Sequence, residues 1–177
     1  SKSMKPFLTS FFAAALGLVL PAVLQARNAP GVERISDVIY TKHDGVALTL
    51  DVFKPAQPNG AGIIKIISGG WKSNHQQIGD GGWTKAGYTT FVVVHGSQPR
   101  FQVEEIVADL NRAVRFIRAN AAKYGVDPQK LGVTGSSAGG HLSLMLATRG
   151  GPGGAKAADT IDRESSAVQA AACFYPP

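Results

Sequence analysis

Apolar residues recur with two different spacings along this chain, and the spacings predict strands and helices. Residues 37–41 and 46–53 flank an Asp-Gly turn, and the second run alternates apolar with polar side chains, as a half-buried hairpin strand does. Two β-branched runs, at 63–67 and 90–94, are typical of buried strands. Between residues 101 and 123 the spacing becomes helical, with one apolar stripe formed by Val103, Ile106, Val107, Leu110, Val114 and Ile117.

The second half of the chain continues this alternation. A short apolar run at 131–134 predicts a strand, a helix follows from His141 towards Arg149, and a last strand begins near Ala167 and ends near Phe174. Strands that alternate with helices form parallel sheets. We therefore expect an α/β domain whose mostly parallel sheet is preceded by an amino-terminal antiparallel hairpin.

The first 26 residues have the pattern of an export signal. Residues 1–3 precede the initiator Met4, Lys5 supplies a positive start, residues 7–23 are almost wholly apolar, and Ala26 offers a small residue for cleavage. This predicts an exported protein, periplasmic or extracellular, whose folded part begins near residue 27. A retained membrane anchor is the alternative, because the apolar run is close to the length that spans a bilayer.

Charge and composition exclude several classes of function. The net charge is +6, and the two lysines of the export segment account for part of it. The basic residues of the 101–123 helix are spread out without interleaved aromatic residues, so we expect a solvated helix face and no nucleic-acid partner. Cys173 is the single cysteine, and its apolar surroundings predict a buried hydrophobe. No His, Cys, Asp or Glu group has the spacing of metal ligands, and no nucleotide fingerprint is present, so we expect neither metal nor cofactor.

The segment Gly135-Ser136-Ser137-Ala138-Gly139-Gly140 lies between the predicted strand and helix and matches Gly-x-Ser-x-Gly. A serine hydroxyl is a poor nucleophile unless a sharp strand-to-helix turn exposes it beside amide donors and a base. Ser136 would need glycine where Thr134 stands, whereas Ser137 has glycine on both required sides. Ser137 is therefore the candidate nucleophile.

Acyl transfer also needs donors for the oxyanion, and backbone N–H groups are suitable because they are rigid and uncharged. Gly69 and Gly70 directly follow a predicted buried strand, at the sheet edge where ligands bind in α/β folds. We predict that the oxyanion hole is formed by the amide of Ala138 together with that of Gly69 or Gly70. Trp71 and His95, which follow two neighbouring strands, are the candidates for the substrate pocket.

Three further polar residues are given structural roles. His43 lies in the hairpin turn and is expected to be solvated. Asp109 is expected to pair with Arg112, nearly one helical turn further on. His141 lies four residues after Ser137 on the same helix, and its side chain is expected to point into the fold rather than to act as the base.

The order of a hairpin, a strand with Gly-Gly-Trp, a long helix and Gly-x-Ser-x-Gly-Gly-His-Leu resembles the α/β-hydrolase fold. It is similar in particular to the esterases related to hormone-sensitive lipase and to bacterial feruloyl and acetyl xylan esterases. The resemblance spans about residues 35–177, and it implies a serine esterase with Ser137, Gly69, Gly70 and Ala138 in the roles given above. Carbohydrate-linked acyl groups are the substrate class that it suggests, alongside small-molecule esters.

The chain departs from this family in two places. Those esterases usually have His-Gly-Gly-Gly-Trp where this chain has Ile67-Ser68-Gly69-Gly70-Trp71, and Asp-Tyr-Arg where it has His95-Gly96-Ser97. Both changes affect the rim of the expected pocket.

The resemblance also places the catalytic Asp or Glu and the His on loops after later strands. We therefore expect the acid and base beyond residue 177, a sheet incomplete at its carboxyl end, and no meaningful turnover by this chain alone. Two alternatives remain open. One is a non-catalytic binding module with the same fold, and the other is a peptidase or lactone-opening variant.

Overall fold

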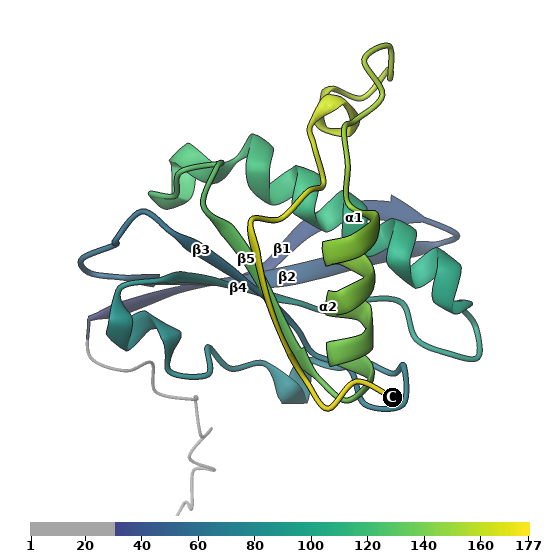
Figure 1. Ribbon diagram of the computed structural model, residues 1–177, viewed down its shortest axis with the longest axis horizontal. Coiled ribbons are helices and arrows are strands. Elements are labelled where there is room, and N and C mark those ends of the chain that lie inside the picture. The colour runs from purple at the N-terminus through teal and green to yellow at the C-terminus, as the bar shows by residue number, and fades with distance from the viewer. Residues whose placement is uncertain (1–30) are drawn as a thin grey trace, which may run out of the picture.

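A single mixed sheet of six strands organises the part of the chain that the computed structural model describes, residues 31–177 (Figure 1). The strand order is β1-β2-β4-β3-β5-β6. The first two strands run antiparallel to their neighbours, and the other four are mutually parallel. This confirms the predicted fold class, whereas the export segment lies outside the described residues. The strands are β1 Val32–His43, β2 Val46–Pro55, β3 Gly62–Ile66, β4 Thr89–Val93, β5 Leu131–Ser136 and β6 Ala170–Phe174.

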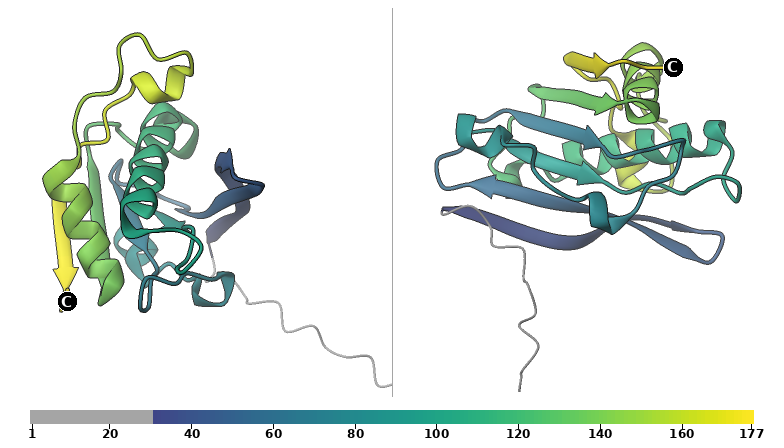
Figure 2. Two further views of the ribbon diagram at one scale, coloured as in Figure 1. Left: turned by 90° about the vertical axis from the view of Figure 1, so that its right-hand side faces the viewer. Right: turned by 90° about the horizontal axis from the view of Figure 1, so that it is seen from below.

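Two α-helices cover one face of this sheet (Figure 2). Helix α1 spans Val103–Ala119, and α2 spans Ala138–Arg149. Glu105 accepts a hydrogen bond at 2.6 Å from the backbone amide of Gln102, which stabilises the start of α1. The core between helices and sheet consists of buried aliphatic and aromatic side chains, among them Leu50, Val52, Ile64, Phe91, Ile106, Leu110, Val114, Leu142 and Leu146.

The opposite face is covered by the connection between β3 and β4. This connection contains two short 3₁₀ helices, η1 His75–Gln77 and η2 Trp83–Ala86. Beneath it lies a smaller apolar cluster that includes Phe53, Ile67, Val92 and Val94. The remaining 3₁₀ helices are η3 Ala121–Tyr124, directly after α1, and η4 Thr160–Arg163.

The segment from Gly150 to Gln169 projects from the end of α2 and returns to β6 past α1, carrying η4 (Figure 1). Arginines of α1 hold it in place. Arg112 binds the carboxylates of Asp159 at 2.6 Å and Asp162 at 2.8 Å. The predicted solvated helix face is therefore wrong for these arginines, because their partners lie more than 40 residues away and leave no local pattern.

The buried guanidinium of Arg118 also binds this segment. It donates hydrogen bonds to three backbone carbonyls, those of Pro128, Ser165 and Ala167. Arg115 donates to a single carbonyl, that of Glu164, at 3.1 Å. Arg118 thus joins α1, the start of β5 and the approach to β6.

The hairpin turn contains a histidine that is not free in solvent. The two ring nitrogens of His43 lie 2.7 Å from the carboxylates of Asp44 and Asp109. The predicted pairing of Asp109 with Arg112 is therefore wrong, as is the expectation that His43 is solvated. The reason is that the long hairpin curves over α1 and brings residues 66 positions apart into contact.

Cys173 is also less buried than predicted. It lies on the edge strand β6, which pairs with β5 on one side, and it is half-exposed. Partial burial raises the pKa of its thiol. Among residues 31–177, no helix combines the length and the apolar character needed to cross a bilayer.

Candidate active site

The candidate residues follow two neighbouring parallel strands. Ile66 of β3 pairs with Gly135 of β5, so Ser68 to Trp71 and Ser136 to Ala138 emerge at the same edge of the sheet. The amide of Gly139 donates to the carbonyl of Ser68 at 3.3 Å and joins the two segments directly. The structure therefore brings the predicted nucleophile and the predicted oxyanion glycines to one place.

Ser137 occupies the turn between β5 and α2 in a rare backbone conformation. Its φ is +52° and its ψ is −129°, a strained combination for a residue with a side chain. Its amide donates to the carbonyl of Phe174 at 3.1 Å, and its carbonyl accepts from the amide of His141 at 3.0 Å. The residue is exposed, and its hydroxyl makes no hydrogen bond to another described residue. The turn thus presents a free hydroxyl at the sheet edge.

The glycines around Ser137 are required by close backbone approach. A Cβ at Gly135 would lie 2.4 Å from the carbonyl oxygen of Gly139, and one at Gly139 would lie 2.5 Å from that of Ile66. A Cβ at Gly140 would lie 2.7 Å from the carbonyl oxygen of Phe174. Real Cβ contacts essentially never fall below 3.0 Å. The sharp turn therefore depends on all three glycines.

A second tight turn lies beside the first. Gly69 and Lys72 exchange two backbone hydrogen bonds, of 2.9 and 3.0 Å, around Gly70 and Trp71. Both central residues have positive φ, +55° for Gly70 and +56° for Trp71, as in a type I′ turn. The amide of Gly69 is therefore engaged within the turn, whereas that of Gly70 makes no hydrogen bond to another described residue. Of the two predicted glycine donors, Gly70 is the one with a free N–H.

The second predicted donor, Ala138, is the first residue of α2. The first amides of a helix have no acceptor within the helix and carry its positive dipole end. Ala138 itself is buried, at 1% exposure, so its N–H is held in a fixed direction. Free amides at Gly70 and Ala138 are suited to bind a developing negative charge on oxygen.

The two predicted pocket residues lie in different environments. Trp71 is half-buried, and its indole N–H donates to Nδ1 of His141 at 3.3 Å. His95 is 2% exposed, and its Nδ1 lies 2.6 Å from the carbonyl oxygen of Gly96. Burial lowers the pKa of His95, so the neutral ring is favoured. Contact of either residue with a substrate stays a prediction.

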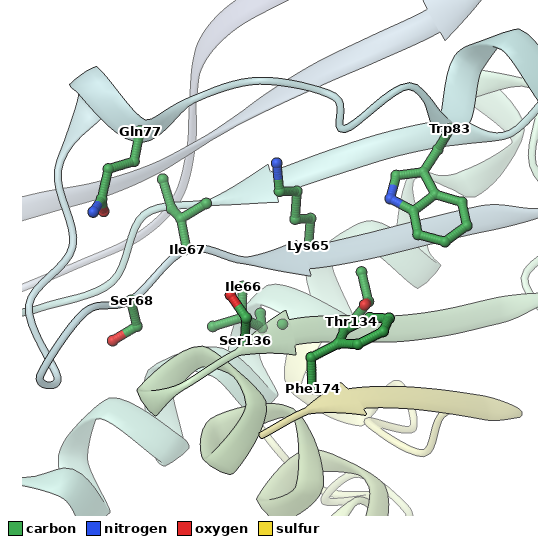
Figure 3. Close-up of a pocket in the computed structure, with 10 residues that line it drawn as sticks. Lys65, Ile66, Ile67, Ser68, Gln77, Trp83, Thr134, Ser136 and Phe174 are labelled. Atoms are coloured by element: carbon green, nitrogen blue, oxygen red, sulfur yellow. The ribbon is translucent and has the colours of Figure 1, made fainter. Parts of the chain in front are cut away.

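A cavity of ≈ 330 Å³ opens beside the strand-to-helix turn and is lined in part by Gly135 and Ser136 (Figure 3). Ser68, Ser136 and Phe174 line it at the strand ends, and Lys65 and Trp83 line it further along the sheet. Lys65 donates to the carbonyl of Gly79 at 2.6 Å, and burial lowers the pKa of its ammonium group. The sequence did not predict this cavity. Because Ser137, Trp71 and His95 do not line it, we assign it no catalytic role.

No cluster of three or more His, Cys, Asp and Glu side chains within residues 31–177 has the arrangement of a metal site. The histidine nearest to Ser137 in sequence, His141, accepts the hydrogen bond of Trp71. That contact agrees with the structural role expected for His141.

Comparison with known proteins identifies the family. The BD-FAE family model matches residues 50–177, which include both turns. The chain belongs to the BD-FAE family. An acetylxylan esterase from Xylanibacter ruminicola is 28% identical over 134 residues, which cover 74% of this chain and 27% of that enzyme. The BD-FAE chain thus spans about a quarter of the length of this curated relative.

Solved structures agree on the fold of this BD-FAE chain. An acetyl ester-xyloside bifunctional hydrolase from Caldicellulosiruptor lactoaceticus superimposes with a TM-score of 0.70 at 24% identity, covering 81% of this chain and 57% of that one. Thermogutta terrifontis esterase 2, phosphoramylated by tabun, gives a TM-score of 0.65 at 30% identity, with coverages of 85% and 58%. The described residues therefore form part of an α/β-hydrolase fold.

Two features of the site were not foreseen from the sequence. One is the hydrogen bond between Trp71 and His141, which are 70 residues apart. The other is the hydroxyl of Ser68, which is buried without a hydrogen-bond partner among the described residues. In the sequence, this unusual hydroxyl is indicated only by the presence of Ser68 where the esterases that the chain resembles have glycine.

Proposed function

We propose that the full-length protein is a serine-dependent hydrolase of carboxylic esters, with Ser137 as its nucleophile. The observation that carries this proposal is the strained, exposed Ser137 at the strand-to-helix turn, at the same edge of the sheet as the free amides of Gly70 and Ala138. Backbone strain of this kind costs about 1–3 kcal/mol, and a fold retains it where function requires it. The esterases among the relatives support the same conclusion.

The proposed reaction proceeds through an acyl-enzyme. The Ser137 Oγ attacks the ester carbonyl carbon while its proton passes to a histidine base, and the N–H groups of Gly70 and Ala138 bind the oxyanion. When the tetrahedral intermediate collapses, the bond to the alcohol oxygen breaks and the protonated base supplies its proton to that oxygen. Water then attacks the acyl-enzyme in the same way, which releases the acid and restores Ser137.

The base and its carboxylate partner are expected on segments outside the described residues. Within residues 31–177 no histidine hydrogen-bonds to Ser137, and His141 is occupied by Trp71. The chain order Ser, acid, His is the usual one in this fold.

The relatives support one substrate class. One is an acetylxylan esterase, and one structural neighbour is an acetyl ester-xyloside hydrolase, so we propose short acyl groups, including those on carbohydrate. Thermogutta terrifontis esterase 2 is phosphoramylated by tabun, a reaction that requires a nucleophile in that protein.

We further propose that the protein is exported, on the pattern of residues 1–26.

The test is hydrolysis of p-nitrophenyl acetate by the full-length protein and two matched variants. Ser137→Ala should lower kcat by about 10⁴-fold or more, because the nucleophile is lost. Ser136→Ala removes the neighbouring hydroxyl and should leave the rate near that of the wild type. Equal rates for Ser137→Ala and the wild type would contradict the proposal.

Covalent labelling provides a second, independent readout. A fluorophosphonate probe should add to Ser137 in the wild type and in Ser136→Ala, as read by peptide mass spectrometry, and should not add to Ser137→Ala. A full-length protein that neither turns over esters nor takes the label would support the non-catalytic binding module instead.

A further inference from the structure

The turn at Gly69–Lys72 places a large side chain where the backbone disfavours it. Trp71 has φ +56°, a left-handed conformation that residues with a Cβ rarely adopt. Gly70 shares the positive φ, but as a glycine it does so without steric cost. Surrounding contacts must therefore hold Trp71 in this conformation.

Two hydrogen bonds of Trp71 hold it there, one from its backbone and one from its side chain. Its carbonyl accepts a hydrogen bond from the amide of Gln98 at 3.2 Å. Its indole Nε1–H donates to Nδ1 of His141 at 3.3 Å, and the two rings meet edge to face with centroids 5.8 Å apart. Because an indole nitrogen can only donate, Nδ1 of His141 must be the acceptor, and the neutral ring carries its proton on Nε2.

The second of these contacts connects the two halves of the proposed oxyanion hole. Trp71 directly follows Gly70, whose N–H is free. His141 lies in the first turn of α2, which begins with Ala138, and its own amide is bonded to the carbonyl of Ser137 at 3.0 Å. A shift of Trp71 relative to His141 would therefore change the separation of the Gly70 and Ala138 amides.

Among the described residues, one backbone hydrogen bond beyond the β3–β5 ladder also joins the two segments. It runs from the amide of Gly139 to the carbonyl of Ser68, and at 3.3 Å it is long for a backbone hydrogen bond. The Gly69–Lys72 turn is exposed at Gly69, Gly70 and Lys72, so solvent rather than packing surrounds its tip. Hydrogen bonds between Ser73 and Ser97 hold the end of the turn, and within the turn the half-buried Trp71 is the residue whose side chain can fix the tip.

We propose that Trp71 and His141 are positioning residues that fix the distance between the two oxyanion donors, an inference that rests on the proposed function. In this role both act through the donor amides and not through the reacting atoms. Donor geometry affects the transition state more than the bound ester, because negative charge develops on the carbonyl oxygen only as the reaction proceeds. Loss of the Trp71–His141 bond should therefore lower kcat while KM changes little.

The test uses the full-length protein and p-nitrophenyl acetate, with rates expressed per active site as titrated with a fluorophosphonate. Trp71→Phe keeps an aromatic ring and removes the N–H donor, and His141→Leu removes the acceptor. Each should lower kcat roughly tenfold with KM within about twofold, since small misplacements in an active site are costly. Trp83→Phe is the matched control at the other tryptophan and should leave kcat unchanged.

Two further variants distinguish a positioning role of the Trp71–His141 bond from a general effect on stability. His141→Asn offers an amide oxygen near the place of Nδ1 and should recover kcat to within about threefold of the wild type. The Trp71→Phe/His141→Leu double variant should lose about tenfold and not about a hundredfold, because both changes remove one interaction. If His141→Leu does not fold, Trp71→Phe and the His141→Asn variant decide the question.

Three results would overturn the inference: wild-type kcat in Trp71→Phe, losses that multiply in the double variant, or no advantage of His141→Asn over His141→Leu. Each is distinguishable from failure of the proposed function. If the proposed function were wrong, Ser137→Ala would have the same rate as the wild type, whatever the rates of the Trp71 variants.

Discussion

Substitution of Gly135 by alanine tests whether the turn at Ser137 depends on close backbone approach. The added Cβ would lie 2.4 Å from the carbonyl oxygen of Gly139, 2.5 Å from its carbonyl carbon and 2.9 Å from the hydroxyl of Ser143. The nearest atoms belong to the backbone of α2 and cannot rotate away. The first turn of α2 must therefore move away from β5.

The size of the effect follows from these distances. Restoring a contact of 3.0 Å requires the Gly139 carbonyl to recede by about 0.6 Å. Forced overpacking of this kind costs about 1–3 kcal/mol, which lowers Tm by roughly 2–12 °C in a chain of this size. The same movement displaces Ser137 and the Ala138 amide, and misplacement of about 1 Å in an active site costs about 10²-fold in rate.

The assay compares Gly135→Ala with Gly132→Ala, which makes the same change on the same strand. A Cβ at Gly132 would find its nearest neighbours at 3.6 Å, an ordinary contact, so this variant should unfold within about 2 °C of the wild type. Thermal unfolding and kcat/KM for p-nitrophenyl acetate are measured for both variants of the full-length protein. If Gly135→Ala matched Gly132→Ala in both measurements, the argument from backbone approach would be refuted.

Two further predictions concern stability. Arg118→Met should lower the free energy of unfolding by about 2–4 kcal/mol in urea titrations, because three carbonyls lose their donor, while Arg115→Met, which removes one such bond, should cost about 1 kcal/mol. A larger loss in Arg115→Met than in Arg118→Met would contradict this ranking. The hydrogen bond to Asp44, and then the bond and charge of Asp109, raise the pKa of His43 above 6.5, against the opposing effect of burial. Protonated His43 therefore makes its whole contribution to the free energy of unfolding below about pH 6.5. This contribution is lost as the pH rises through the pKa of His43 in the folded state. The difference in unfolding free energy between the wild type and His43→Gln should be larger at about pH 5.5 than at about pH 8.5, and an equal difference at both would refute it.

The order and type of the elements could be predicted because each depends on local pattern. The Asp44-Gly45 turn, the β-branched run of β3 and the helical stripe of α1 each involve only neighbouring residues. The structure has a hairpin turn, a strand and a helix at these places. The boundaries differ from those expected. β1 begins at Val32, earlier than expected, because its irregular first half alternates poorly around Asp37, which has φ +56°.

The polar contacts between elements could not be predicted in this way. His43 with Asp109, and Arg112 with Asp159 and Asp162, join positions 47 to 66 residues apart. Local spacing suggested the nearer pairing of Asp109 with Arg112, which the fold does not use. Charged side chains are long and rotate freely, so the partner is set by which segments the sheet and helices bring together.

The sequence by itself determined the strand-to-helix turn around Ser137, because glycines at Gly135 and Gly139 are a local requirement that spacing reveals. It also determined that Gly69 and Gly70 lie at the end of a buried strand. Only the tertiary structure decided that the Gly70 amide is free while that of Gly69 is engaged, and that Trp71 is bonded to His141. The reason is physical: a turn is specified by the conformational limits of a few adjacent residues, whereas a hydrogen bond across 70 residues exists only after the sheet has aligned both turns at one edge.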